Sequence, residues 1–201
     1  NKNIFQEFKL LISKEYRKIF LISLILCIFG MSAYWFTYSW LPTYLEQERG
    51  LALISTTFGI ILIQSGDFIG YTTFGFVAEK LGRRPAFTIY SFIMALSISM
   101  ITIFWNQIDK IPDLILVFMF LTGFGTGFFG GFGALFSELF PTKIRNTGVG
   151  TVFNLARGAQ FITPVIISIV ATFFDLSYGI AIAAIFAVLV GVWIWVFPET
   201  K

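Results

Sequence analysis

The chain has 201 residues, of which 57% are hydrophobic and only 12% charged, and its mean hydropathy is +0.83. Soluble domains are roughly half apolar and about a quarter charged. With 26 Phe, 5 Trp and 7 Tyr, the chain has too few polar residues to coat a globule, so the composition excludes a soluble enzyme. The net charge of +3 also argues against a nucleic-acid partner. The composition indicates an integral membrane protein.

The residue types limit the chemistry further. The sequence contains no His, so metal sites, catalytic triads and proton relays that depend on imidazole are absent. The single Cys27 lies in an apolar run, where an inert thiol is expected. No G-x-S-x-G nucleophile motif occurs, so a membrane enzyme is not indicated. We expect no cofactor and no bound metal.

Six apolar stretches are long enough to cross a bilayer, since about 20 residues of helix span about 30 Å of hydrocarbon. They are too long and too rich in Leu, Ile and Phe for barrel strands, which alternate over about ten residues. The chain is therefore predicted to be all-α, with residues 19–198 forming one six-helix unit. The expected helices lie at roughly 19–43, 54–78, 86–106, 114–137, 147–173 and 178–197.

The basic residues are distributed unevenly between the loops. Of the 14 Lys and Arg residues, the loops on one side hold all but Arg49, Lys110 and the intramembrane Arg157. The positive-inside rule then places both ends of this segment in the cytoplasm, in a multi-pass protein of the cell membrane. Tyr44 and Trp105, like Trp40, fall near the outer ends of their helices, where interfacial aromatic anchors are expected.

Residues 1–18 precede the first expected span and are charged and amphipathic. Phe5 and Phe8 alternate with charges such as Lys9, which predicts a helix over 4–18 lying in the membrane interface. A cytoplasmic linker between two membrane halves would have this form, and residues 199–201 would then begin a cytoplasmic tail. Since the first residue is Asn rather than Met, we expect a fragment of a longer protein.

The loop between the second and third expected helices carries a ten-residue motif. Gly75 is expected to permit close packing at the helix end, and Gly82 to close a tight turn. Glu79 offers an acceptor to a neighbouring helix N-terminus. An ordinary positively charged turn would explain the basic residues but neither the acid nor both glycines. The motif reads Gly75-Phe76-Val77-Ala78-Glu79-Lys80-Leu81-Gly82-Arg83-Arg84.

This motif resembles the signature of the major facilitator superfamily, G-x-x-x-[DE]-[KR]-x-G-[RK]-[RK]. Residues 138–145 resemble the E-x-x-P-x-x-x-R loop between helices ten and eleven of that family, and residues 198–201 the P-E-T-K sequence after helix twelve in its sugar and metabolite porters. The resemblance implies that the chain is the C-terminal half of a twelve-helix fold, helices seven to twelve. Its partner would be the missing N-terminal six-helix half.

The resemblance also implies a cytoplasmic gate that closes the inner side of the protein, with Glu79 capping a helix of the other half. The alternative is a set of solvated surface pairs worth less than about 1 kcal/mol each. Alternating access needs an intracellular contact that can break, which favours the gate. Its implied members are Gly75, Glu79, Lys80, Gly82, Arg83, Arg84, Glu138, Arg145 and Glu199.

Two charged residues, Asp67 and Arg157, lie near mid-depth in the expected spans. A charge at the bilayer centre costs about 2.5–3.5 kcal/mol on insertion scales, so each is expected to be functional and to face protein or water. Asp67 can titrate and is predicted to carry a proton, whereas Arg157 keeps its charge and can bind a carboxylate through two parallel hydrogen bonds. A structural ion pair is the alternative.

Residues 153–161 around Arg157 resemble the helix-eleven F-N-x-x-R pattern of metabolite and sialic-acid proton symporters. The predicted substrate-binding residues are Arg157, Asn154, Gln160, Tyr38 and Gln64. Further candidates for the wall of a cavity, with packing or lipid contact as an equal alternative, are Tyr34, Trp35, Thr37 and Ser39.

In the fourth expected helix, Gly123, Gly127 and Gly131 recur every four residues, a pattern that lets helices approach closely. A phosphate-binding loop is excluded because no G-K-[ST] follows and the run is intramembrane.

The sequence thus predicts a secondary transporter that couples protons to symport of a small organic acid or related metabolite by alternating access. No ATP-binding motif is present, which favours secondary over primary transport. A uniporter or antiporter of neutral or cationic solutes is the nearer alternative, with Arg157 as a structural partner and Asp67 in contact with the substrate. A self-sufficient six-helix pore or structural membrane protein is the alternative from a different class.

Overall fold

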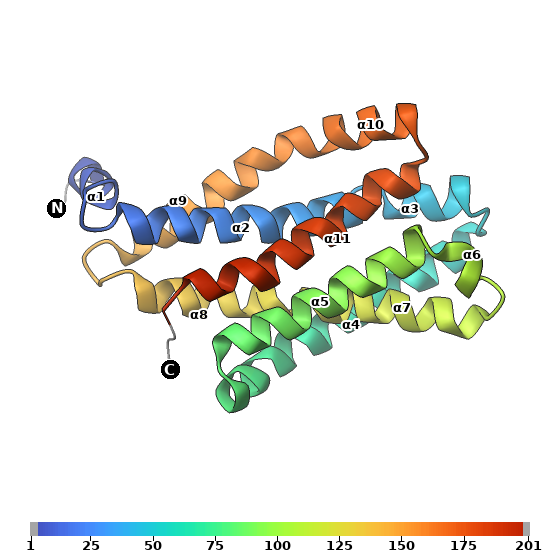
Figure 1. Cartoon of the computed structure of the whole chain (residues 1–201), viewed down its shortest axis with the longest axis horizontal. Helices are drawn as coiled ribbons and strands as arrows, with labels where there is room; N and C mark the ends of the chain where they lie inside the picture. Colours follow the sequence, from blue (N-terminus) through green and yellow to red (C-terminus); the bar gives the residue numbers. More distant parts are fainter. Residues whose placement is uncertain (1–3, 199–201) are drawn as a thin grey trace.

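In the computed structural model, which describes residues 4–198, all regular secondary structure is helical (Figure 1). The elements, in chain order, are α1 (Ile4–Leu11), α2 (Arg17–Tyr38), α3 (Leu41–Thr43), η1 (Tyr44–Glu48), α4 (Leu53–Leu81), α5 (Arg83–Thr102), α6 (Trp105–Ile108), α7 (Pro112–Gly125), η2 (Thr126–Phe128), α8 (Phe129–Leu139), α9 (Arg145–Gly158), η3 (Ala159–Ile162), α10 (Thr163–Phe173), α11 (Leu176–Trp193) and η4 (Ile194–Val196).

Six helical runs within the described residues are long and apolar enough to cross a membrane, so the six expected helices are confirmed. Several consist of more than one element, because a short turn of different pitch interrupts the α-helix. The runs are Arg17–Glu48, Thr56–Leu81, Arg83–Thr102, Asp113–Leu139, Arg145–Phe173 and Leu176–Val196.

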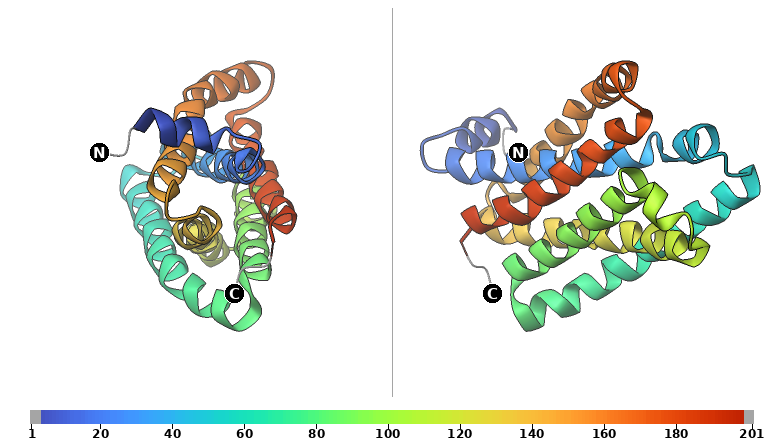
Figure 2. Two further views of the ribbon diagram at one scale, coloured as in Figure 1. Left: turned by 90° about the vertical axis from the view of Figure 1, so that its left-hand side faces the viewer. Right: turned by 45° about the vertical axis from the view of Figure 1, so that its right-hand side comes forward.

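The helices form a bundle in which α11 packs against both α2 and α5, and α4 packs along α7. Helices α9 and α10 lie on one side of α2, and α4, α5 and α7 lie on the other (Figure 1). The end-on view in Figure 2 shows α1 lying across the end of the bundle beside α9. Helix α1, the α4–α5 turn, the α8–α9 loop and the end of α11 all lie at this same end.

Two expected boundaries differ from the structure. The first span continues to Glu48 because Pro42 lies in the first turn of α3, where its missing N–H interrupts no helical hydrogen bond. The expected amphipathic helix over 4–18 is shorter, since α1 ends at Leu11, whose side chain is fully buried in the core. The chain then turns through a hydrogen bond from Tyr16 N to Ser13 O of 3.2 Å before α2 begins.

Two spans are broken near their middle. The fourth contains the 3₁₀ turn η2 between α7 and α8, and the fifth contains the 3₁₀ turn η3 between α9 and α10. Pro164 lies in the first turn of α10, where it cannot donate the backbone hydrogen bond that would continue α9 without a break. Short 3₁₀ segments inside a helix often mark hinges.

The glycine pattern of Gly123, Gly127 and Gly131 is confirmed as a packing face of the fourth span against α4. A Cβ atom on Gly123 would lie 1.8 Å from Ile63 O, and one on Gly66 would lie 2.1 Å from Phe120 O. Between helices in lipid, close backbone approach of this kind replaces the hydrophobic driving force. The consequence for function is that Asp67, directly after Gly66, is held against the fourth span.

Candidate functional site

Asp67 is half-buried near the middle of the second span. Its Oδ1 accepts a hydrogen bond of 2.8 Å from the Tyr38 hydroxyl on α2. The same oxygen accepts a second hydrogen bond, of 2.5 Å, from Thr126 Oγ1 in η2. One carboxylate therefore joins three spans, and both of its hydrogen-bond donors are neutral hydroxyl groups.

Tyr34 and Tyr38 form a stacked pair on α2, with ring centroids 4.3 Å apart and ring planes at 11°. This stacking supports the ring whose hydroxyl binds Asp67. Tyr71 is exposed on α4 one turn after Asp67. Thr37 does not line a cavity, since it is fully buried and its hydroxyl donates to Ala33 O at 2.8 Å.

Arg157 lies on α9, and its side chain is exposed near the middle of the fifth span. The one salt bridge within residues 4–198 joins two other residues, so the alternative of an Asp67–Arg157 ion pair is wrong for this conformation. Asn154, one turn before Arg157, is also exposed, and its Nδ2 donates to Gly150 O at 2.8 Å. An exposed guanidinium at this depth has to meet water or protein rather than lipid.

The two predicted glutamines lie in different environments. Gln64 is exposed on α4, three residues before Asp67 and therefore on the same side of the helix. Gln160 is 7% exposed, and its Oε1 accepts hydrogen bonds from Ser32 Oγ at 3.1 Å and Thr163 Oγ1 at 3.0 Å. Gln160 thus connects η3 to α2, and the structure does not bring it together with the exposed Arg157 side chain.

The ten-residue motif forms the end of α4, the turn and the start of α5. Gly82 has φ +95°, a conformation that side chains rarely adopt, so the tight turn expected there is confirmed. Arg83 forms an ion pair with Glu138 of α8. Arg84 donates to Phe197 O and lies 5.8 Å from the centre of the Trp195 ring, and Arg145 Nε donates to Phe140 O at 3.3 Å.

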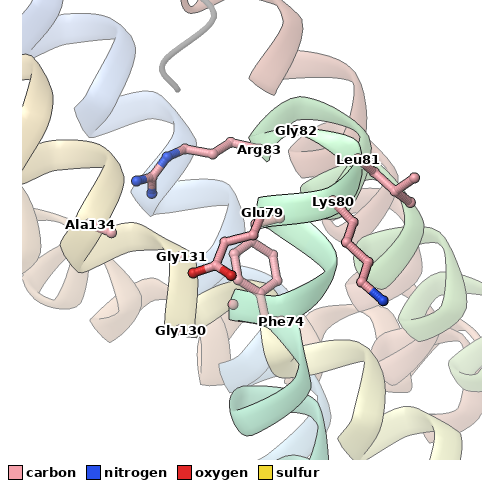
Figure 3. A pocket seen from close by; sticks show the side chains of 11 residues that line it. Phe74, Glu79, Lys80, Leu81, Gly82, Arg83, Gly130, Gly131 and Ala134 are labelled. Carbon is pink, nitrogen blue, oxygen red and sulfur yellow. The ribbon is translucent and has the colours of Figure 1, made fainter.

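A cavity of about 680 Å³ lies between this turn and the fourth span (Figure 3). The exposed carboxylate of Glu79 points towards Gly131 and Phe74, and Lys80 points away (Figure 3). No described residue comes within 4 Å of a Cβ placed on Gly75, so the expectation of close packing at that glycine is wrong within this part of the chain. The lining residues are Phe74, Gly75, Ala78, Glu79, Lys80, Leu81, Gly82, Arg83, Gly130, Gly131 and Ala134.

Glu79 has no hydrogen-bond or ion-pair partner among residues 4–198, so its expected helix-capping partner is not supplied by this part of the chain. Glu199, the last expected member of the gate, lies outside the described residues.

Sequence reasoning missed a polar cluster at the opposite end of the bundle. Arg49 donates to the Tyr44 hydroxyl at 2.6 Å, to Thr102 O at 3.1 Å and to Ser177 Oγ at 3.0 Å. Glu48 accepts hydrogen bonds from Leu176 N at 2.7 Å and from Ser177 Oγ at 3.1 Å. This Arg49 cluster joins η1, α5 and α11.

The Arg49 cluster also corrects the expectation for two aromatic residues. Tyr44 is 0% exposed and Trp105 is 7% exposed, so neither is an interfacial anchor. Both rings belong to a hydrophobic cluster, and the Arg49 guanidinium lies 4.9 Å from the Tyr44 ring centre and 5.2 Å from that of Trp105.

Comparison with known proteins gives one family and several relatives. The family model for the Major Facilitator Superfamily matches residues 62–201. The chain is 29% identical over 181 residues to the cis,cis-muconate transport protein of Acinetobacter baylyi, covering 90% of this chain and 41% of that protein. It is 30% identical over 184 residues to the D-galactonate transporter of Escherichia coli O6:H1, covering 88% and 42%.

The sialic acid transporter NanX of Escherichia coli K12 is 26% identical over 186 residues, which cover 89% of this chain and 44% of the relative. The chain therefore spans less than half the length of these curated relatives.

Proposed function

The chain belongs to the Major Facilitator Superfamily, and from that premise we propose that it is the C-terminal six-helix half of a proton-coupled secondary transporter. The whole protein carries a small organic acid or related metabolite across a cell membrane by alternating access. Both ends of this segment face the cytoplasm, and an N-terminal six-helix half completes the cavity.

The observation that carries this proposal is the exposed Arg157 guanidinium, which has no carboxylate partner among the described residues. A permanent cation at mid-depth calls for an anion, because an unpaired charge there is costly. A substrate carboxylate supplies that anion and matches the two-pronged geometry of a guanidinium. The relatives named for muconate, galactonate and sialic acid, all organic acids, support this substrate class.

Asp67 supplies the second part of the mechanism. Its carboxylate is held by Tyr38 and Thr126 and is free of any ion pair with Arg157 within the described chain. It can therefore gain and lose a proton while Arg157 remains charged. One proton moved with one monovalent carboxylate transfers no net charge, so the substrate crosses without working against the membrane potential.

The Arg83–Glu138 ion pair and the cavity beside Glu79 support the third part, a cytoplasmic gate. Glu79, exposed and pointing into that cavity, accepts the N-terminus of a helix from the other half when the inner side is closed. For the inner side of the transporter to open, the contacts of the gate have to break. Partly exposed charge pairs break at modest cost in free energy.

The test uses the full-length protein in proteoliposomes, with internal and external pH recorded while carboxylates and matched neutral analogues are added outside. Alkalinisation outside that only carboxylates elicit supports proton–anion symport. Protein-free vesicles control for diffusion of undissociated acids. Transport without a pH change, or of neutral compounds only, contradicts the proposed mechanism and leaves the family assignment unaffected.

A further inference from the structure

We propose that Thr126 is a positioning residue for Asp67, and that its one hydroxyl hydrogen moves between Asp67 and the backbone of its own span as Asp67 loses or gains a proton. This inference rests on the proposed role of Asp67 as the proton carrier. It assigns a role to a residue that the sequence patterns did not single out.

The geometry creates a competition for one hydrogen atom. Thr126 Oγ1 lies 2.5 Å from Asp67 Oδ1 and 2.7 Å from Gly123 O. Both of these oxygens accept when Asp67 is ionised, but a hydroxyl group has a single hydrogen to donate. The ionised carboxylate therefore takes the hydrogen, because hydrogen bonds to charged groups are the stronger ones, and Gly123 O loses its hydroxyl donor.

Protonation removes the competition. When a proton from the open, aqueous side adds to Asp67 Oδ1, the new O–H donates to Thr126 Oγ1, which still has lone pairs to accept with. The Thr126 hydrogen then turns to Gly123 O, so both short contacts become hydrogen bonds. Loss of the proton to water on the other side reverses the change, and no other covalent bond forms or breaks.

The acceptor on the backbone gives this exchange a structural consequence. Thr126 is the first residue of η2, the 3₁₀ break in the fourth span, and Gly123 lies in the last turn of α7. The hydroxyl of Thr126 thus bridges the start of the break and the helix before it. The backbone of Gly123 also lies against Ile63 of α4, so a change in its hydrogen bonding is felt at the α4–α7 contact.

Three tyrosines surround Asp67, namely Tyr34 and Tyr38 from α2 and Tyr71 from α4. From α5, the Tyr90 hydroxyl is engaged at 2.8 Å with Thr73 Oγ1.

The charged groups of the packed elements lie at their ends. They are Arg17 and Lys18 at the start of α2, Arg83 and Arg84 at the start of α5, Asp113 at the start of α7 and Glu138 near the end of α8, with Glu79 and Lys80 at the end of α4 itself. The hydroxyl groups of Tyr38 and Thr126 therefore dominate the immediate setting of the carboxylate.

The test replaces Thr126 in the full-length protein and follows the protonated carboxyl band of Asp67 by infrared spectroscopy as the pH is varied. Asp67→Asn identifies the band, because it removes that carboxyl group alone. Thr126→Val deletes the hydroxyl at nearly constant volume, and the ionised form of Asp67 loses a donor. In Thr126→Val, we expect the pH at which Asp67 is half-protonated to rise by about one pH unit. Thr126→Ser, which keeps the hydroxyl, should restore the wild-type value.

Thr122→Val is the matched control. Thr122 is fully buried on α7, one turn before Thr126, and its hydroxyl donates to the backbone of its own helix, to Phe118 O at 2.8 Å. We expect this variant to leave the midpoint unchanged. If Thr126→Val does not fold, Thr126→Ala removes the same hydroxyl and carries the same expectation.

The outcomes separate this inference from the proposed function. A wild-type band that titrates, together with an unshifted midpoint in Thr126→Val, overturns the role of Thr126 and leaves Asp67 as the proton carrier. Equal shifts in Thr126→Val and Thr122→Val overturn it as well, because the effect is then one of packing. The absence of any titrating band that Asp67→Asn removes overturns both proposals together.

Discussion

Arg83, the first residue of α5, forms an ion pair with Glu138 in the last turn of α8. The two side chains are 19% and 34% exposed, so the pair adds little to stability and can break without a large penalty. It joins the turn after the second span to the end of the fourth span. A contact of this kind suits a gate better than a permanent brace.

Replacing both arginines of the turn tests the gate. In the full-length protein, Arg83→Ala with Arg84→Ala should lower the maximal uptake rate about fivefold or more, while the substrate concentration for half-maximal uptake changes little. The reason is that the proposed gate stabilises the state closed on the cytoplasmic side, one of the two states through which each transport cycle passes. Initial-rate measurements in proteoliposomes check this, and the exchange pair Arg83→Glu with Glu138→Arg should recover part of the rate. An unchanged uptake rate in the double-alanine variant would contradict the proposed gate.

Asp67→Asn tests proton coupling. The amide cannot carry a proton at Oδ1, so uptake driven by a pH gradient should be lost while exchange of labelled for unlabelled substrate continues. Both are measured in the same vesicles, and Asp113→Asn, an exposed acid at the start of α7, is the control. Retained accumulation driven by the pH gradient would falsify the role of Asp67.

Arg157→Lys separates charge from geometry. Lysine keeps the positive charge but loses the planar fork, so the apparent affinity for a carboxylate substrate should fall by about tenfold or more. Binding of the substrate to detergent-solubilised full-length protein, followed by calorimetry, measures this directly. Equal affinity in the variant would mean that Arg157 does not grip a carboxylate through two hydrogen bonds.

Two glycines of the fourth span make a matched stability test. Gly123→Ala places a methyl group against Ile63 O and should destabilise the fold by at least about 1–3 kcal/mol, as overpacking does. Gly133→Ala, where nothing lies within 4 Å, should have little effect. Thermal unfolding of the purified variants compares them, and equal stability would contradict the backbone contact between α4 and α7.

The Arg49 cluster gives a prediction of its own. Arg49→Ala removes three hydrogen bonds and two ring contacts, so we expect a clear fall in unfolding temperature and weaker attachment of η1 to α11. Arg49→Lys should not restore stability, because one ammonium group cannot reach all three acceptors. Full recovery by lysine would show that charge alone matters there.

The spans, the turn at Gly82 and the depth of the two intramembrane charges could be predicted from the sequence, because each depends on local composition. Hydropathy over about 20 residues defines a span, and a glycine after a charged helix end predicts a tight turn. The sequence also located Asp67 and Arg157 correctly within their spans, since helix rise converts residue number into depth.

The partners of those residues could not be predicted, because they come from distant parts of the chain. Thr126 lies 59 positions from Asp67, and Ser177 lies 128 positions from Arg49. Tyr44 and Trp105 show the same limit: their positions near helix ends are typical of interfacial anchors, but both are buried in a hydrophobic cluster with residues from other helices. Gln160 has the spacing of a ligand and is satisfied instead by Ser32 and Thr163.

The 3₁₀ turn η3 divides the fifth span into two helical segments, α9 and α10. Arg157 belongs to the first segment, α9, whereas the second segment, α10, has 11 residues and is therefore about 16 Å long at 1.5 Å per residue. A tilt of about 10° at η3 swings the far end of such a segment by about 3 Å. Such a tilt would move the far end of α10 by about the width of a substituent while the Arg157 guanidinium stays where it is.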